Sequence, residues 1–168
     1  QYYVEYRSFI AGRVANAKEV TLTTILNAIL NSNVVYCGDY HTLRQSQRTF
    51  LRIIRELKLL RQNMVIGLEM FMAEHQKWVD EFLAGRITEE ELLAKTDYYS
   101  TWGFPWNNYR PIILFARDHN IPILALNTTP SSRHKGTVLK KRDIEASDLM
   151  RDSLRRFPGH IHCVLFGD

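Results

Sequence analysis

The sequence lacks three features that would each point to a special class of protein. No apolar run approaches the roughly 20 residues of a membrane-spanning helix, so no transmembrane segment is expected. There are only two cysteines in 168 residues, too few for a disulfide-built miniprotein. The 22 Lys and Arg residues exceed the 18 Asp and Glu residues by only four, and they are scattered among the acids. A nucleic-acid partner is therefore not expected, because such proteins gather their basic residues in a patch.

Several common catalytic and binding motifs are also missing. The chain has no Walker loop and no Gly-x-Gly-x-x-Gly turn, which argues against the two common modes of nucleotide binding. It has no Gly-x-Ser-x-Gly elbow, which argues against a serine hydrolase of the α/β type. The chain starts at Gln1 rather than at a start methionine, so these residues do not define its compartment.

What the sequence does contain is an alternation of short apolar segments with helical ones. The apolar segments predict strands over residues 34–37, 64–68, 121–126 and 161–166. Apolar residues at helical spacing predict helices over residues 22–31, 45–61, 74–84, 89–95, 108–119 and 144–157. Strands that alternate with helices pair in parallel, and strands that are apolar throughout are covered on both faces. The sequence thus predicts one α/β domain over residues 1–168, with a three-layer, mainly parallel sheet and helices on both faces.

Local signals refine these helices. Thr88 and Glu91 form a capping box at the start of one helix. Pro111 suits the first turn of a helix that opens at Asn108 or Arg110. Residues 131–142 are basic and predict a loop.

The helix over residues 45–61 has one basic side. That side carries Arg48, Arg52, Arg55 and Lys58. It can meet an anion, or it can be the solvated face of a helix that covers the sheet, and the second interpretation is favoured.

Polar or ionisable residues follow every predicted strand. They are Gly38-Asp39-Tyr40-His41, Glu69, Asn127 and Gly167-Asp168. In parallel α/β sheets the carboxyl ends of the strands lie at one edge, and ligands bind there. A sheet covered by helices has no structural need for so many such groups at one edge, so we expect the functional site there.

Among these residues, His41 and Glu69 are the pair with the clearest possible chemical role. An imidazole beside a carboxylate can act as an oriented general base, or both groups can ligate a metal. Asp39 and Asp168 can fill a further ligand position or hold the other imidazole nitrogen. The structural alternative makes Asp39 a helix cap, His41 a loop residue and Glu69 the cap of the next helix. Because polar or ionisable residues follow every predicted strand, a functional site is favoured over this structural alternative.

Other candidates carry weaker signals. His160 and His162 alternate on one strand face, as a metal pair or, more typically, as buried histidines. His119 is expected at the surface. A cluster of aromatic residues either walls a flat ligand or packs a loop on the sheet, and packing is favoured. The cluster comprises Tyr98, Tyr99, Trp102, Trp106 and Tyr109.

The order of these motifs resembles that of a known family. The segment Val34–His41, the Gly67-Leu68-Glu69 strand end and the aromatic stretch over residues 102–109 are similar to the ChaN-like family of bacterial haem-binding proteins. The resemblance covers most of residues 20–130. It extends to a larger grouping with the Tiki and TraB proteins and the erythromycin esterases.

The resemblance implies a function in haem or iron uptake, without turnover. It implies a lipid-anchored protein of the bacterial cell envelope that works as a homodimer. The resemblance implies haem binding in which a tyrosine ligates the iron, with a histidine and a lysine near the propionates. On this basis Tyr40, His41 and Lys135 are the expected haem contacts, and Lys140 and Lys141 are further partners for the propionates.

The same grouping implies an alternative function as a hydrolase. Its members place a Gly-x-x-His motif and a strand-end glutamate in a metal site or a general-base site, and His41 and Glu69 match those positions. His41 and Glu69 would then be catalytic, or would bind a divalent metal together with Asp39. Many members carry glutamate where this chain has the shorter Asp39. A third interpretation is a scaffold domain that has kept the site without using it.

The resemblance also bears on the extent of the chain. Family members are longer than 168 residues. Gly167-Asp168 repeats Gly38-Asp39, so the sequence is expected to stop inside a second strand-end motif.

Overall fold

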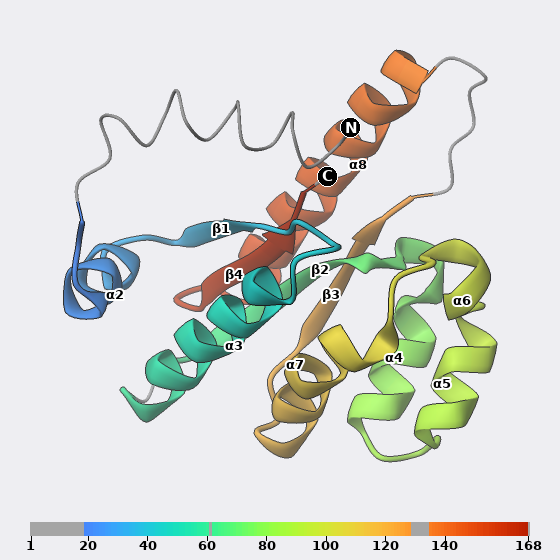
Figure 1. Cartoon of the computed structure of the whole chain (residues 1–168), viewed down its shortest axis with the longest axis horizontal. Coiled ribbons are helices and arrows are strands. Elements are labelled where there is room, and N and C mark those ends of the chain that lie inside the picture. Colours follow the sequence, from blue (N-terminus) through green and yellow to red (C-terminus); the bar gives the residue numbers. More distant parts are fainter. Residues whose placement is uncertain (1–18, 61, 129–134, 168) are drawn as a thin grey trace.

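The structure is a computed structural model that describes residues 19–60, 62–128 and 135–167, and only the backbone of residues 135–139. Figure 1 shows the arrangement of its helices and strands. In chain order these are α2 (Leu22–Leu30), β1 (Val34–Gly38), α3 (Arg44–Leu59), β2 (Met64–Met72), η1 (Ala73–His75), α4 (Gln76–Leu83), α5 (Glu89–Lys95), α6 (Tyr98–Thr101), α7 (Trp106–Asp118), β3 (Ile123–Asn127), α8 (Lys135–Arg156) and β4 (Ile161–Phe166). No helix in the described ranges has both the length and the apolar character needed to cross a membrane.

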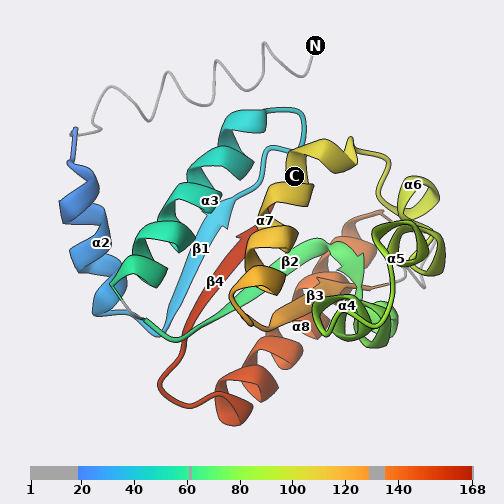
Figure 2. The same ribbon diagram turned by 90° about the horizontal axis from the view of Figure 1, so that it is seen from below.

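The four strands form one parallel sheet in the order β1-β4-β2-β3. The last strand therefore lies between the first and the second (Figure 2). Val34 of β1 pairs with His162, and Gly67 of β2 pairs with Val164. The parallel pairing confirms the fold class that the sequence predicts.

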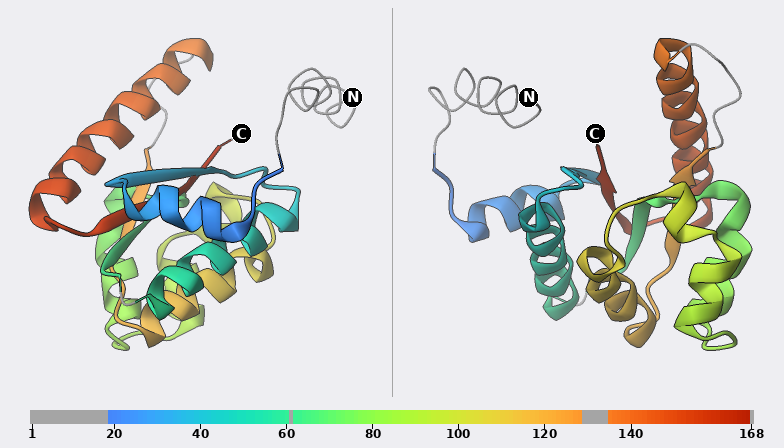
Figure 3. Two further views of the ribbon diagram at one scale, coloured as in Figure 1. Left: turned by 90° about the vertical axis from the view of Figure 1, so that its left-hand side faces the viewer. Right: turned by 45° about the vertical axis from the view of Figure 1, so that its right-hand side comes forward.

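Helices cover both faces of this sheet (Figure 3). α3 and α7 pack on one face, where the main core contains Phe50 and Ile54 of α3 and Ile113 of α7. α8 packs on the other face, where Ala146 and Met150 meet Val164. The fold is thus the three-layer α/β arrangement that the apolar strands predict.

Gly67 allows the close packing of side chains on the α8 face of the sheet. A Cβ atom at this position would lie 2.8 Å from Leu126 Cδ1 and 3.2 Å from Val164 Cγ2. The two neighbouring side chains fill the space that a side chain at Gly67 would need. Gly67 thus permits a close approach of neighbouring side chains inside the sheet.

The capping box at Thr88 and Glu91 is present as predicted. The Thr88 hydroxyl accepts from the Glu91 N–H (3.2 Å), and the Glu91 carboxylate accepts from the Thr88 N–H (2.8 Å). These two bonds satisfy N–H groups that a helix start otherwise leaves free.

β2 is longer than predicted. The sequence predicts an end before Glu69, whereas the strand continues to Met72. Met70 and Phe71 are buried, so the apolar run resumes beyond the carboxylate. Glu69 therefore lies inside the strand, and a buried acid within an apolar run explains the early predicted end.

α7 begins earlier than predicted, at Trp106 directly after Pro105. Pro111 therefore lies in the second turn of the helix, not in the first as expected. Its ring offers no N–H to the carbonyl of Asn107, one turn earlier. Asn107 is exposed, so water can bind that carbonyl instead.

α8 also begins earlier than predicted, at Lys135, so the expected basic loop is helical from there onward. Residues 131–134 of that loop lie outside the described residues. Within the helix, Lys141 pairs with Glu145 one turn later, at 3.6 Å. Arg142 reaches the sheet, and such long-range contacts favour a helix where the composition alone indicates a loop.

A buried polar contact joins α8 to β4. Ser153 Oγ lies 2.9 Å from His162 Nε2, and both residues are buried. The other ring nitrogen of His162 donates to the His160 carbonyl at 3.2 Å. Burial lowers the pKa of His162 from its ordinary value of 6.5. The pair packs the helix on the sheet, and His162 is a buried histidine rather than half of a metal pair.

We expect this contact to make stability depend on pH. Because the folded pKa of His162 lies below 6.5, the unfolded chain binds more protons as the pH falls through that value. The free energy of unfolding should therefore decrease as the pH falls below about 6.5. Urea unfolding of the wild type and of His162→Gln, between pH 7.5 and 5, measures this effect. The variant should show a shallower pH dependence, and equal slopes in the two proteins would contradict the assignment.

Candidate functional site

Asp39 is the centre of a buried polar cluster at the carboxyl edge of the sheet. It follows β1 directly and is 2% exposed. Its carboxylate accepts hydrogen bonds from the side-chain amide of Gln47, from the Tyr109 hydroxyl at 2.8 Å and from His41 Nδ1 at 2.9 Å. Gln47 belongs to α3 and Tyr109 to α7, so a single carboxylate joins the strand end to both helices of that face.

The hydrogen bond to Asp39 fixes the tautomer of His41. A carboxylate only accepts, so Nδ1 carries the hydrogen and Nε2 of the neutral ring has the free lone pair. The ring packs against two aromatic side chains that also contact each other, 4.5 Å from the Trp102 centroid and 4.6 Å from the Phe104 centroid. This arrangement orients His41 as a general base or as a nitrogen ligand.

Tyr109 donates to this cluster and remains protonated. Burial, the negative charge of Asp39 and the hydrogen bond to its carboxylate raise the pKa of Tyr109 far above its ordinary value of 10.0. The phenol is thus a fixed donor to Asp39. Gln47 contributes a hydrogen-bond acceptor, because its buried Oε1 has no hydrogen-bond partner within the described residues. The cluster therefore retains one acceptor for a donor group of a ligand or a water.

Glu69 lies nearby on β2, on the face that α8 covers, and is 2% exposed. Its Oε1 accepts from Arg142 Nη1 at 2.5 Å, and its Oε2 accepts from the Gly167 N–H at 2.8 Å. Burial raises the pKa of Glu69, while the Gly167 N–H and the Arg142 charge oppose that rise. Arg142 is thus the counter-ion of the carboxylate.

Gly167 joins the two parts of this edge. A Cβ atom at Gly167 would lie 2.7 Å from the Asp39 carbonyl oxygen and 2.8 Å from the Asp39 nitrogen. The Asp39 N–H also donates to the Phe166 carbonyl at 3.2 Å. Only a residue without a side chain fits between the backbone of Asp39 and the carboxylate of Glu69.

The structure brings together at one edge of the sheet the residues that follow the predicted strands, but His41 and Glu69 have different hydrogen-bond partners. His41 pairs with Asp39, whereas Glu69 pairs with Arg142 and Gly167. In the described part of the chain, no group of three His, Cys, Asp or Glu side chains is arranged to hold a metal ion. A metal shared by His41, Glu69 and Asp39 stays a prediction.

The structural alternative for these residues is wrong in two respects. The N-cap of α3 is Leu43, not Asp39, and it makes no side-chain cap bond. The helical segment after β2 begins beyond Met72, so Glu69 is no cap either. Asn127 at the end of β3 accepts from the neighbouring Thr128 N–H (2.9 Å), and Asp168 lies outside the described residues.

The expected haem contacts lie in two places. Tyr40 is half-buried in the turn beside His41, where its N–H donates to Ser46 Oγ at 3.4 Å. Lys135 is the first residue of α8, where only the backbone is described. Lys140, which follows in the same helix, is exposed. These contacts stay predictions.

A pocket of about 350 Å³ opens between α8 and the carboxyl ends of the strands. Tyr36 of β1 borders it and is 65% exposed. The Arg142 guanidinium lies over the Phe166 ring, 4.9 Å from its centroid. The remaining lining residues are Leu126, Asp143, Ala146, Ser147, Met150 and Gly167. A phenol, a cation and an apolar wall thus border one open pocket.

Comparison with known proteins gives one family. The family model described as "Haem-binding uptake, Tiki superfamily, ChaN" matches residues 25–150. Among curated protein sequences, none matches this chain.

Solved structures share the fold at low sequence identity. ChaN of Campylobacter jejuni, described with cofacial heme binding, has a TM-score of 0.61 and 15% identity over 89% of this chain and 76% of that chain. The RRSP effector domain of a Vibrio vulnificus MARTX toxin has a TM-score of 0.63 and 24% identity, covering 84% of this chain and 29% of that chain. The C-terminal region of Pasteurella multocida toxin has a TM-score of 0.67 and 15% identity, covering 89% of this chain and 21% of that chain. This chain therefore spans less than a third of either toxin chain.

Proposed function

Because this chain belongs to the ChaN family of haem-binding uptake proteins in the Tiki superfamily, we propose that it binds haem in bacterial haem or iron uptake. The family match over residues 25–150 carries the proposal. The proposal includes the finer expectations of a homodimer and of a lipid-anchored protein in the cell envelope.

The residues at the carboxyl edge suit such a ligand. Haem supplies an iron that accepts an oxygen or nitrogen donor, a flat apolar ring and two carboxylates. The phenols of Tyr36 and Tyr40 and the imidazole of His41 are the donors at this edge. The apolar wall of the pocket beside Phe166 can contact the ring.

The start of α8 suits the carboxylates. Lys140 and Lys141 are exposed there, and Lys135 opens the same helix. Ammonium groups form charge-assisted hydrogen bonds with carboxylates. We therefore assign the propionates to this end of α8.

A titration of ferric haem into the protein tests the proposal. We expect a saturable shift of the Soret band, with a high-spin, tyrosinate-like spectrum. Of Tyr36→Phe and Tyr40→Phe, the variant that lacks the iron ligand should lose this spectrum. Tyr99→Phe is the matched control, because Tyr99 is 66% exposed on α6 and does not line the pocket beside Phe166. The absence of a saturable Soret shift in the wild type would contradict the proposal.

The geometry of His41 and Asp39 favours one second candidate, a hydrolase in which His41 is the general base. Asp39 orients the imidazole in the way that a carboxylate orients a catalytic histidine. Assay against a panel of p-nitrophenyl esters, with and without added divalent metal, tests this function. His41→Ala should abolish turnover while the protein stays folded, and retained turnover would remove His41 from the mechanism.

A further inference from the structure

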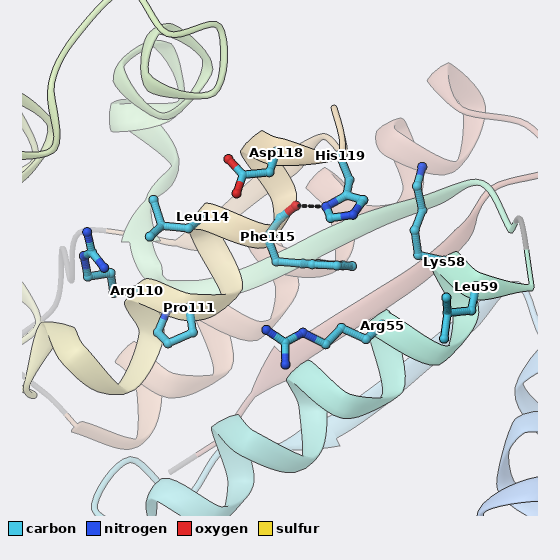
Figure 4. Close-up of a pocket in the computed structure, with 9 residues that line it drawn as sticks. All are labelled: Arg55, Lys58, Leu59, Arg110, Pro111, Leu114, Phe115, Asp118 and His119. Carbon is cyan, nitrogen blue, oxygen red and sulfur yellow. Dashed lines mark hydrogen bonds between the residues drawn. The ribbon is translucent and has the colours of Figure 1, made fainter.

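A second groove lies on the outside of the molecule, between α3 and α7, and shares no residue with the cluster around Asp39 (Figure 4). Its volume is about 580 Å³, within the usual range of small-molecule sites. It is lined by Arg55, Lys58, Leu59, Arg110, Pro111, Leu114, Phe115, Asp118 and His119.

The floor of this groove is apolar. Leu59 is 77% exposed, a large apolar surface left open to solvent. The Phe115 ring packs against the His119 ring with centroids 4.2 Å apart. Leu114 and Pro111 extend the apolar surface along α7.

The rim of the groove is positively charged. Arg55 and Lys58 both come from α3, and Figure 4 draws the Arg55 guanidinium toward Pro111 and the Lys58 side chain beside His119, at the two ends of the Phe115 ring. Within residues 19–60, 62–128 and 135–167, neither cation forms an ion pair, and Arg55 instead lies 5.8 Å from the Phe115 centroid. Two positive charges thus border an apolar floor without a counter-ion.

The other charges of the groove already have partners. Arg110 Nε donates to both carboxylate oxygens of Glu89, at 2.7 and 2.8 Å. Asp118 lies 3.5 Å from Arg117 Nε. His119 Nδ1 donates to the Phe115 carbonyl at 2.9 Å, which holds its ring against the floor. An incoming anion would therefore meet Arg55 and Lys58 first.

We infer that this groove binds an amphipathic organic anion, with a flat apolar body on Phe115 and Leu114 and a phosphate or carboxylate group at Arg55 and Lys58. Both cations end long side chains that can turn toward the groove, where charge-assisted hydrogen bonds from them would hold the anionic group. The inference goes beyond haem binding at the carboxyl edge and does not depend on it. Arg48 and Arg52, on the same basic side of α3, border no part of this groove and remain a solvated face.

Calorimetric titration with 2-naphthyl phosphate tests the inference. We expect one saturable site, and Arg55→Gln or Lys58→Gln should each weaken binding about tenfold, because each removes a charge-assisted hydrogen bond. Arg48→Gln is the matched control, since it removes the same charge from the same helix outside the groove. It should leave the affinity unchanged within about twofold, as expected for a distant surface site.

Further probes separate the two parts of the ligand. Naphthalene-2-carboxylate shows whether the site prefers a carboxylate to a phosphate, and either preference supports the inference. Uncharged 2-naphthol and inorganic phosphate should both bind much more weakly than 2-naphthyl phosphate.

Three results would overturn the inference. The first is no saturable binding of either naphthyl anion. The second is an equal loss of affinity in Arg48→Gln and Arg55→Gln, which indicates nonspecific attraction. The third is a dimer that Leu59→Asp dissociates while neither naphthyl anion binds, which makes the groove a contact between two copies of the chain. Haem titration of Arg55→Gln, expected to match the wild type, keeps this test separate from the proposed function.

Discussion

Arg142→Ala is expected to lower the free energy of unfolding by about 3–5 kcal/mol, because removing one partner of a buried ion pair leaves the other charge uncompensated. Glu69 would stay buried inside β2, and among the described residues the Gly167 N–H would be its remaining hydrogen-bond partner. Chemical denaturation at pH 7.5 measures the loss. The burial that raises the pKa of Glu69 also predicts that the loss shrinks at lower pH, as the carboxyl takes up a proton.

Two variants control this prediction. Arg151→Ala removes an arginine from the same helix, where it forms a surface pair with Asp148 at 2.8 Å. That change should cost less than about 1 kcal/mol, as is usual for exposed pairs. Glu69→Gln combined with Arg142→Ala should recover much of the stability. An Arg142→Ala protein as stable as Arg151→Ala would show that the buried pair contributes little.

Asp39→Ala is the second change with a large expected effect. It removes the acceptor of three side chains, namely Gln47, Tyr109 and His41. Each buried donor left without a partner costs about 1–3 kcal/mol, so the variant should lose at least about 3 kcal/mol of stability. Thermal or urea unfolding measures the loss.

Asp39→Asn is the matched control for this cluster. An amide of the same shape retains one acceptor oxygen for Tyr109 and His41. Gln47 has a buried Oε1 without a described partner, so its amide can turn to accept from the new NH₂ group. The loss should therefore be clearly smaller than for Asp39→Ala. Equal losses would mean that the shape of residue 39, rather than its acceptors, holds the cluster together.

Much of the architecture follows from local sequence. The last strand is bounded as predicted, at Ile161 and Phe166, because its apolar run is uninterrupted and lies between polar segments. The meeting of Asp39, Glu69 and Gly167 at one edge follows from parallel pairing alone. These features depend on periodicity and on strand direction, which are local properties.

The partners inside the site depend on contacts between distant segments. Tyr109 lies 70 residues from Asp39, and Arg142 lies 73 residues from Glu69. Nothing in the local pattern pairs them, since Tyr109 belongs to an aromatic stretch that also packs the core. Gln47 did carry a signal. It shares the buried face of α3 with Phe50 and Ile54, and a polar residue on such a face needs a polar partner in the core.

The strand order has a consequence for how the chain acquires its fold. Among the described strands, β1 forms ladder hydrogen bonds only with β4, more than 120 residues later in the chain. During synthesis β2 and β3 can pair as soon as both have left the ribosome, whereas the backbone of β1 must wait for Ile161–Phe166. Of the four described strands, the first to be made is therefore paired only when the last one appears. Until β4 appears, the nascent chain exposes the backbone edge of β1 to other chains, and closing so long a loop is slow.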